Sequence, residues 1–174
     1  MTNILSKYLG KYDDQDYIFL HTSPTKNDGE LLQGILNIPI NEVEKVRYFI
    51  KFLSGASGQV NRVVISLPIS DSNFKDFITT HKLISIISDE YPSDSRFEIQ
   101  WLVDEESDGS EDLKTNDELV DLCGAFLRSR DDHHILESFD SKDIVYSYPG
   151  FSVNSWVIVY YSNGFLNYIS FEQG

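Results

Sequence analysis

Polar side chains that could perform acid–base or nucleophilic chemistry follow three predicted strands, at the points where those strands end. His21 ends a compact apolar strand, Ser70 follows a second strand, and Asp104 follows a third. If these strands are parallel neighbours, the three side chains share one rim of an open α/β sheet, where sites in such sheets gather. A histidine, a hydroxyl and a carboxylate are groups that acid–base and nucleophilic catalysis use. Loop polarity and helix capping account for the same residues, so a site at this rim is the alternative hypothesis.

Four adjacent potential metal ligands, Asp131, Asp132, His133 and His134, follow a predicted helix. Successive side chains point apart on a strand and splay on a helix, so chain neighbours rarely converge on one ion. No distant pair of histidines or cysteines at ligand spacing completes the set. We interpret this segment as a polar loop after a helix C-terminus and expect no metal in it.

The acidic segment 104–114 begins like an EF-hand loop, with Asp104, Glu106 and Asp108 at alternate positions. It departs from that pattern at the twelfth position, where Thr115 stands in place of a bidentate glutamate. The segment before it also has the pattern of a strand and not of a helix. We therefore expect a solvated loop without a calcium site, and the sequence predicts no cofactor.

The chain is strongly acidic, because 28 acidic residues outnumber 14 basic ones and give a net charge of −14. Nucleic acids and anionic membranes are bound through clustered Lys and Arg, and the basic residues form no cluster along this sequence. We therefore expect no binding to nucleic acid or to membranes. Acidic residues are densest over 104–121, which includes Glu105, Glu106 and Asp108. Such a field speeds encounter with a basic protein, although acidity that only keeps the chain in solution is an alternative.

Aromatic residues are concentrated near the C-terminus, with nine of them between positions 146 and 171. Tyr and Trp offer a large contact area with a polar tip, and protein interfaces are enriched in them. The alternative is a core filled with large side chains, since the chain has only two alanines. The residues of this group that we expect at an interface are Tyr148, Phe151, Trp156, Tyr161 and Tyr168.

Helices that position these groups are predicted from apolar residues at helical spacing. Asn41 with Glu44, and Thr115 with Glu118, have the spacing of helix-capping residues. The predicted helices cover residues 43–53, 73–90 and 115–130, with a further short helix over 1–9.

Strands are predicted from apolar runs and from alternating apolar and polar residues. They cover residues 17–21, 62–67, 96–103, 144–148, 156–161 and 165–171, with a turn over 24–29. Residues 31–40 are predicted as a returning strand, with a short helix broken at Gly34 as the alternative. Asn163-Gly164 predicts a two-residue turn that places Trp156 opposite Phe171. Both faces of this hairpin are apolar, so helices or a partner chain must cover it.

The order of these elements predicts a single α/β domain over residues 1–174, with α+β as the alternative. We expect one mixed β-sheet flanked by about three helices, in the order ββαβαβαβββ, with a C-terminal antiparallel hairpin. A strand, a helix and a strand between residues 62 and 103 predict a right-handed βαβ crossover. One cysteine, Cys123, permits no intrachain disulfide, and the N-terminus lacks the pattern of a signal peptide. We therefore expect a cytoplasmic protein.

These observations favour a non-catalytic protein-binding module, such as an inhibitor, an immunity-type protein or an assembly partner of a basic protein. The hypothesis depends on the missing catalytic motifs, the acidity and the aromatic C-terminal segment. A homodimer is expected if the hairpin lacks cover from within the chain. The residue usage is typical of an AT-rich genome, as in a low-GC bacterium or its phage. A small enzyme or ligand-binding domain at the rim near His21, Ser70 and Asp104 is the alternative.

Overall fold

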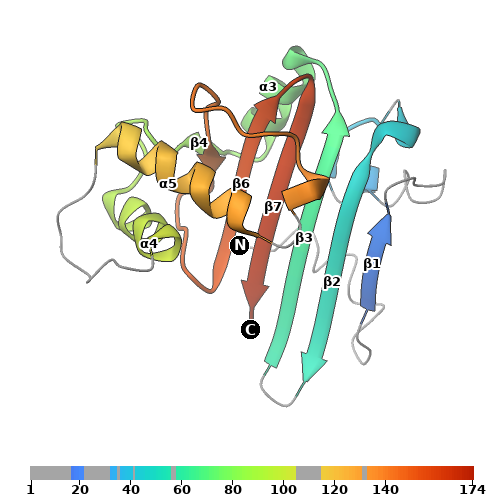
Figure 1. Cartoon of the computed structure of the whole chain (residues 1–174), viewed down its shortest axis with the longest axis horizontal. Helices are drawn as coiled ribbons and strands as arrows, with labels where there is room; N and C mark the ends of the chain where they lie inside the picture. Colours follow the sequence, from blue (N-terminus) through green and yellow to red (C-terminus); the bar gives the residue numbers. More distant parts are fainter. Residues whose placement is uncertain are drawn as a thin grey trace.

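The computed structural model describes residues 17–21, 32–34, 36–40, 42–55, 58–104, 115–130 and 133–174. These residues form a single β-sheet with helices packed against it (Figure 1). Every strand pair in the sheet is antiparallel. The fold is therefore α+β. The single sheet with its helices is confirmed, whereas the parallel pairing of a mixed α/β sheet is wrong.

Within the described residues the sheet has seven strands, which lie side by side in the order β1-β2-β3-β7-β6-β5-β4. The strands are β1 (Tyr17–His21), β2 (Arg47–Gly55), β3 (Gly58–Pro68), β4 (Ile84–Ser85), β5 (Tyr146–Ser147), β6 (Ser155–Ser162) and β7 (Phe165–Gln173). The helices described from end to end are α3 (Asp71–Thr80), α4 (Ser93–Val103) and α5 (Asn116–Ser129), with the 3₁₀ turns η1 (Val43–Lys45) and η2 (His133–Ile135).

The segment 43–53, predicted as a helix, forms the turn η1 and then most of strand β2. Val46, Tyr48 and Ile50 are buried on one face of the sheet, and Phe49 packs against the opposite face. The apolar residues of this segment fit the strand period as well as the helical one. Pairing with β1 on one side and β3 on the other satisfies the backbone groups of β2 and decides for the strand.

The segment 96–103, predicted as a strand, lies in helix α4. Ile99 is fully buried there, whereas Trp101 is 48% exposed. Pro92 stands directly before the helix, where the missing N–H of a proline has no cost. The predicted βαβ crossover is therefore wrong. Helix α3 also ends at Thr80 instead of continuing to residue 90, and Lys82 takes a left-handed conformation in the turn toward β4.

Residues 32–34 and 36 are helical, so the preferred strand over 31–40 is wrong. The alternative of a helix is closer, but Gly34 is itself helical and does not break it. Leu32 and Leu36 are one turn apart and both are fully buried, which explains why a helical turn suits this segment. The helix predicted over 1–9 and the turn predicted over 24–29 lie outside the described residues.

The C-terminal hairpin and the third helix are confirmed. Asn163 and Gly164 both have positive φ, at 52° and 80°, as a two-residue hairpin turn requires. Trp156 pairs with Phe171 in the predicted register. Thr115 caps α5, and both hydrogen bonds of its capping box with Glu118 are present.

Both faces of the central strands are covered by other parts of the chain. On one face, Phe74 and Phe77 of α3 pack into a core with Leu32. On the other face, Ile99 of α4 and Leu119 of α5 pack over the sheet. The cover that the hairpin needs is therefore supplied within this chain. Among the described helices, none has the length and apolar content of a membrane span.

Candidate functional site

The three side chains that were predicted to share a rim do not follow three parallel neighbouring strands. Residue 21 ends β1, which is separated from β3 by β2, and the side chain of His21 lies outside the described part of the structure. Ser70 is the N-cap of α3, where its Oγ accepts the N–H of Asn73 at 3.2 Å. Asp104 caps the C-terminal end of α4. The geometry brings together no catalytic set from these residues.

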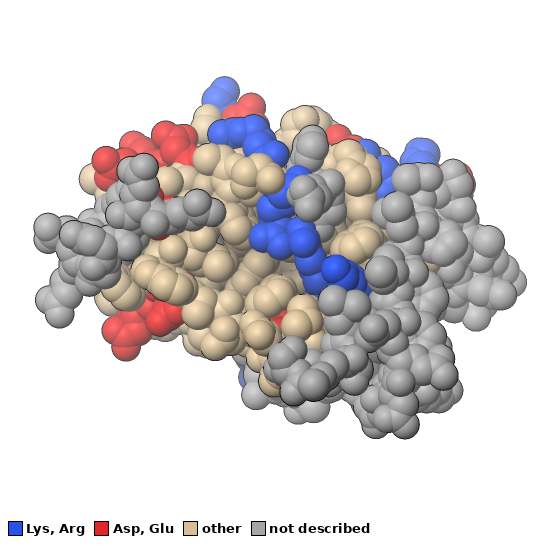
Figure 2. Space-filling model, turned by 60° about the horizontal axis from the view of Figure 1, so that its bottom comes forward, with Lys and Arg blue, Asp and Glu red and all other residues tan. Residues whose placement is uncertain are grey.

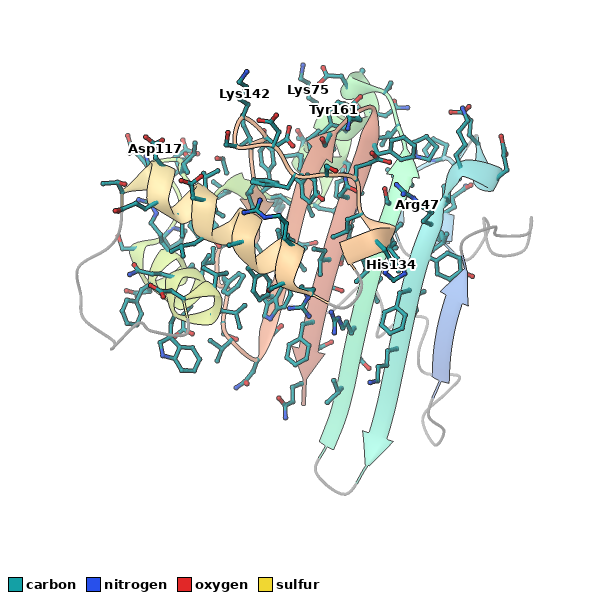
Figure 3. The ribbon with its side chains drawn as sticks, in the orientation of Figure 1. Arg47, Lys75, Asp117, His134, Lys142 and Tyr161 are labelled. Carbon is teal, nitrogen blue, oxygen red and sulfur yellow. The ribbon has the colours of Figure 1, made fainter. Side chains whose placement is uncertain are left out.

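The four potential metal ligands at positions 131–134 are only partly described. His134 is exposed at η2 (Figure 3), whereas Asp131, Asp132 and the side chain of His133 lie outside the described part. Among the side chains that the structure describes, no three His, Cys, Asp or Glu residues gather in a way that could hold a metal ion. The acidic residues Glu105, Glu106 and Asp108 also lie outside the described ranges.

Most of the aromatic residues predicted at an interface are part of the core. Phe151, Trp156 and Tyr168 are buried, and burial raises the pKa of Tyr168 far above its ordinary value. Tyr148 is half-buried, and burial also raises the pKa of its phenol. Tyr161 is half-buried and lines a cavity. The alternative of a core filled with large side chains is therefore confirmed for the three buried residues.

The exposed aromatic side chain that was not predicted is Trp101 on α4, with 48% of its surface exposed. Phe97 lies one turn before it and is half-buried, and Glu98 lies on the same side of the helix. We call these three residues the α4 surface. A strand over this segment would have placed Trp101 in the core on the same side as Phe97. In the helix, Ile99 is buried and Trp101 is exposed to solvent.

Acidic side chains also follow the segment 105–114, at the start of helix α5. Asp117, Glu118 and Asp121 are exposed in the first turns of α5, and Figure 3 shows Asp117 at the far end of this helix from η2. Helices α4 and α5 pack against each other. The α4 surface and the acidic start of α5 therefore border the two ends of the acidic segment that the sequence singled out.

Basic residues come together on one face although they are scattered along the sequence. Lys51 on β2 and Arg62 on β3 are cross-strand partners. Arg62 and Arg130 line a hollow of about 550 Å³. The Arg130 guanidinium lies 4.7 Å from the centroid of the Phe126 ring and 5.2 Å from that of Trp156. Figure 2 shows Lys and Arg in a band across this face, with Asp and Glu gathered to its left.

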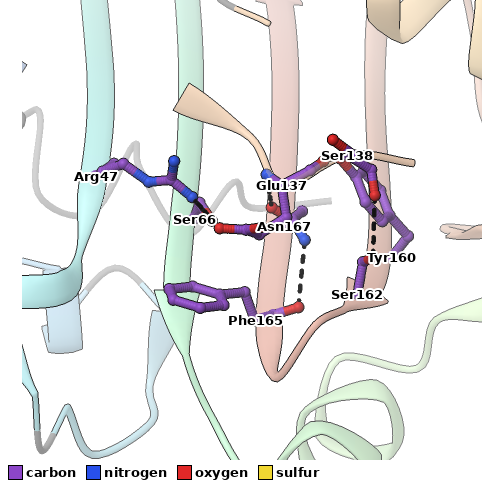
Figure 4. A network of polar contacts seen from close by, with 8 residues as sticks. All are labelled: Arg47, Ser66, Glu137, Ser138, Tyr160, Ser162, Phe165 and Asn167. Carbon is purple, nitrogen blue, oxygen red and sulfur yellow. Dashed lines mark hydrogen bonds and ion pairs between the residues drawn. The ribbon is translucent and has the colours of Figure 1, made fainter. Parts of the chain in front are cut away.

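A half-buried ion pair between Arg47 and Glu137 belongs to a network that holds the chain after η2 against the sheet (Figure 4). The Glu137 N–H donates to the Asn167 side-chain oxygen at 2.9 Å, and the Tyr160 hydroxyl donates to the Glu137 carbonyl. Arg47 also donates to Ser66 at 3.3 Å. Arg47, Ser66, Asn167 and Tyr160 are successive cross-strand partners on β2, β3, β7 and β6. Because these groups bind one another, we interpret the network as structural.

A cavity of about 390 Å³ lies between α3, strands β5 and β6, and the turn before β5. We call it the α3 groove. Its aromatic wall contains Tyr161, and its rim carries Lys75 and Lys142. Figure 3 shows these three side chains near one another at the upper end of the sheet. Ile144 also borders this cavity and is 46% exposed.

Comparisons with protein-family models, with curated proteins and with solved structures found no match for this chain. Its function therefore has to be inferred from the geometry of these surfaces.

Proposed function

We propose that this chain is a non-catalytic protein-binding module whose partner presents a basic surface. The observation that carries the proposal is the exposed Trp101, which by helical spacing lies on the same side of α4 as Phe97 and Glu98. Tryptophan is enriched among the residues that dominate binding energy at interfaces. An aromatic contact beside an acidic group suits a partner that combines an apolar pocket with Lys or Arg at its edge.

The charge around this surface favours a basic partner. Residues 115–127 contain Asp117, Glu118 and Asp121 and no Lys or Arg, and the whole chain carries a net charge of −14. Complementary charge raises the rate of encounter more than it strengthens the final complex. We therefore expect the acidic residues at the start of α5 and in the segment before it to steer the partner toward the surface. Trp101 would contribute to the lifetime of the complex.

A capture experiment with matched variants tests this proposal. The chain is immobilised and exposed to lysate of its source organism at low salt, and bound proteins are identified by mass spectrometry. Trp101→Ser should abolish capture of the main partner. Ile144→Ser is the control, because Ile144 is the other large apolar side chain strongly exposed in the described part of the chain and lies at the α3 groove.

Association kinetics with the captured partner test the electrostatic part. Neutralising Glu98, Asp117 and Asp121 together should lower the association rate at low salt and flatten its dependence on ionic strength. Neutralising Glu105, Glu106 and Asp108 should act in the same direction. Capture that survives Trp101→Ser, or a partner that is itself acidic, would contradict the proposal.

A further inference from the structure

We propose that the α3 groove is a binding site for a small aromatic carboxylate, separate from the α4 surface. The groove lies at the end of the sheet where α3 approaches β5 and β6. Its volume of about 390 Å³ falls within the usual range of small-molecule pockets, roughly 300–1,000 Å³. Three aspects of its lining carry the inference: an aromatic wall, a fixed shape, and hydrogen-bond donors at the opening.

The wall of the groove is made of rings that present both faces and edges. The rings of Phe74 and Tyr161 are stacked with their centroids 5.0 Å apart, and Tyr146 meets Phe74 edge-on at 5.8 Å. Ile78 and Ile144 complete the apolar lining. Stacked and edge-on contacts are the arrangements that aromatic rings prefer. A planar aromatic ligand would extend this cluster and would cover the exposed surface of Ile144.

A hydrogen bond holds one ring of the aromatic wall in place. The Tyr161 hydroxyl donates to the carbonyl of Ile69 at 3.1 Å, so this ring does not need to move when a ligand enters. A wall that is already ordered loses little conformational freedom on binding.

The turn that carries one side of the groove is fixed as well. The Asp143 carboxylate accepts the N–H of Asp140 at 2.8 Å, and the Asp140 carboxylate accepts the N–H of Lys142 at 2.9 Å. The Asp143 N–H donates in turn to the Asp140 carbonyl at 2.8 Å. These bonds place Lys142 and Ile144 at the opening of the groove.

The polar groups at the opening favour an acceptor on the ligand. The two carboxylates that line the groove are already engaged, because Asp71 pairs with Lys75 at 2.6 Å and Asp143 accepts the backbone N–H of the turn. Lys142 forms no ion pair with any described residue. Lys75 has three N–H donors, of which the Asp71 pair uses one. The Lys142 ammonium is therefore the group at this rim with which a ligand carboxylate would pair.

The phenol of Tyr146 adds a hydroxyl donor on the same wall, and Tyr146 lines the groove together with Lys75. The Tyr146 hydroxyl makes no hydrogen bond to the described residues. An aromatic ring placed against Phe74 could thus direct its carboxylate toward Lys142 and the Tyr146 hydroxyl. Aromatic contact would supply the binding energy, and the donors would select the charge of the ligand.

Titration of the full chain with 2-naphthoate, followed by calorimetry and by NMR chemical shifts, tests the inference. We expect saturable binding, with shifts confined to residues around the groove. 2-Naphthamide, which has the same ring without the charge, should bind more weakly. Lys142→Met should weaken 2-naphthoate binding by about fivefold, the upper end for an exposed ion pair, and should leave 2-naphthamide binding unchanged.

Two control variants separate this inference from a general effect of charge and from the proposed function. Lys45→Met removes an exposed lysine outside the groove and should leave 2-naphthoate binding unchanged. Trp101→Ser should also leave it unchanged. The inference is overturned if 2-naphthoate does not bind, if 2-naphthamide binds equally well, or if Lys142→Met has no effect. It is likewise overturned if Lys142→Met abolishes capture of the protein partner, because the groove would then belong to that interface.

Discussion

The Nε2 atom of His81 lies 2.9 Å from the carbonyl oxygen of Leu36. The imidazole must donate in this contact, because a carbonyl only accepts, and so Nε2 carries a proton in the neutral ring. The ring also packs against Phe77, with centroids 4.3 Å apart. His81 thereby ties the C-terminal end of α3 to the helical turn at Leu32–Leu36, and burial lowers the pKa of its imidazole.

This lowered pKa predicts a loss of stability in mild acid. Below the unfolded-state pKa of about 6.5, the histidine of the unfolded chain binds a proton more readily than folded His81 does. The free energy of unfolding should therefore fall as the pH decreases below about 6.5. Urea denaturation between pH 7 and pH 5 measures this. His81→Gln should show a weaker decrease than the unmodified chain, and parallel pH curves for the two proteins would show that His81 does not contribute.

Asn167 is predicted to be a sensitive position in the sheet. Its side-chain oxygen accepts the N–H of Glu137, and Asn167 itself is fully buried. Asn167→Ala removes this acceptor and leaves a half-buried N–H without its partner, which should lower the free energy of unfolding by about 1–3 kcal/mol. Gln173→Ala at the exposed end of β7 is the control and should change stability little. Similar urea midpoints for both variants would refute the structural role of Asn167.

Thr115→Ala should lower the free energy of unfolding by about 1 kcal/mol, because the change removes the N-cap of α5. The matched control is Ser93→Ala at the start of α4, where no side chain caps the helix. Thermal and urea unfolding of the two variants give the comparison. A larger loss for Ser93→Ala than for Thr115→Ala would contradict the capping geometry.

Cys123 is predicted to be unreactive in the native protein. The thiol is fully buried, and burial raises its pKa to about 12, so little nucleophilic thiolate forms at neutral pH. A colorimetric disulfide reagent should react slowly in native buffer and rapidly in concentrated urea. Cys123 is the one cysteine of the chain, so the signal has a single source. Rapid stoichiometric reaction without urea would mean that the core around α5 opens readily.

The sequence alone determined the elements whose signals are local. Asn163-Gly164 set the hairpin turn and the pairing of Trp156 with Phe171, because a two-residue turn leaves one register. Thr115 and Glu118 set the start of α5, since both capping bonds join residues three positions apart. The core position of Cys123 followed from the apolar stripe of the same helix. None of these features depends on a distant partner.

Tertiary structure decided the elements whose apolar residues fit two periods. Val46 and Ile50 are four residues apart, which suits one face of a helix and one face of a strand equally. The segment forms a strand because β1 and β3 pair with it from other positions in the chain. Residues 96–103 form a helix instead, and no strand pairs with them in the described sheet.

Whether residues 96–103 form a strand or a helix also decides which side chains are exposed on the α4 surface. A strand over 96–103 would place Phe97 and Trp101 on the buried side, whereas the helix buries Ile99 and exposes Trp101. The α3 groove joins Phe74, Lys142 and Tyr161 from three separate segments, so spacing along the chain carried no sign of it. Local propensity selects turns and caps, but the face that an apolar segment buries is settled by the surface against which it packs.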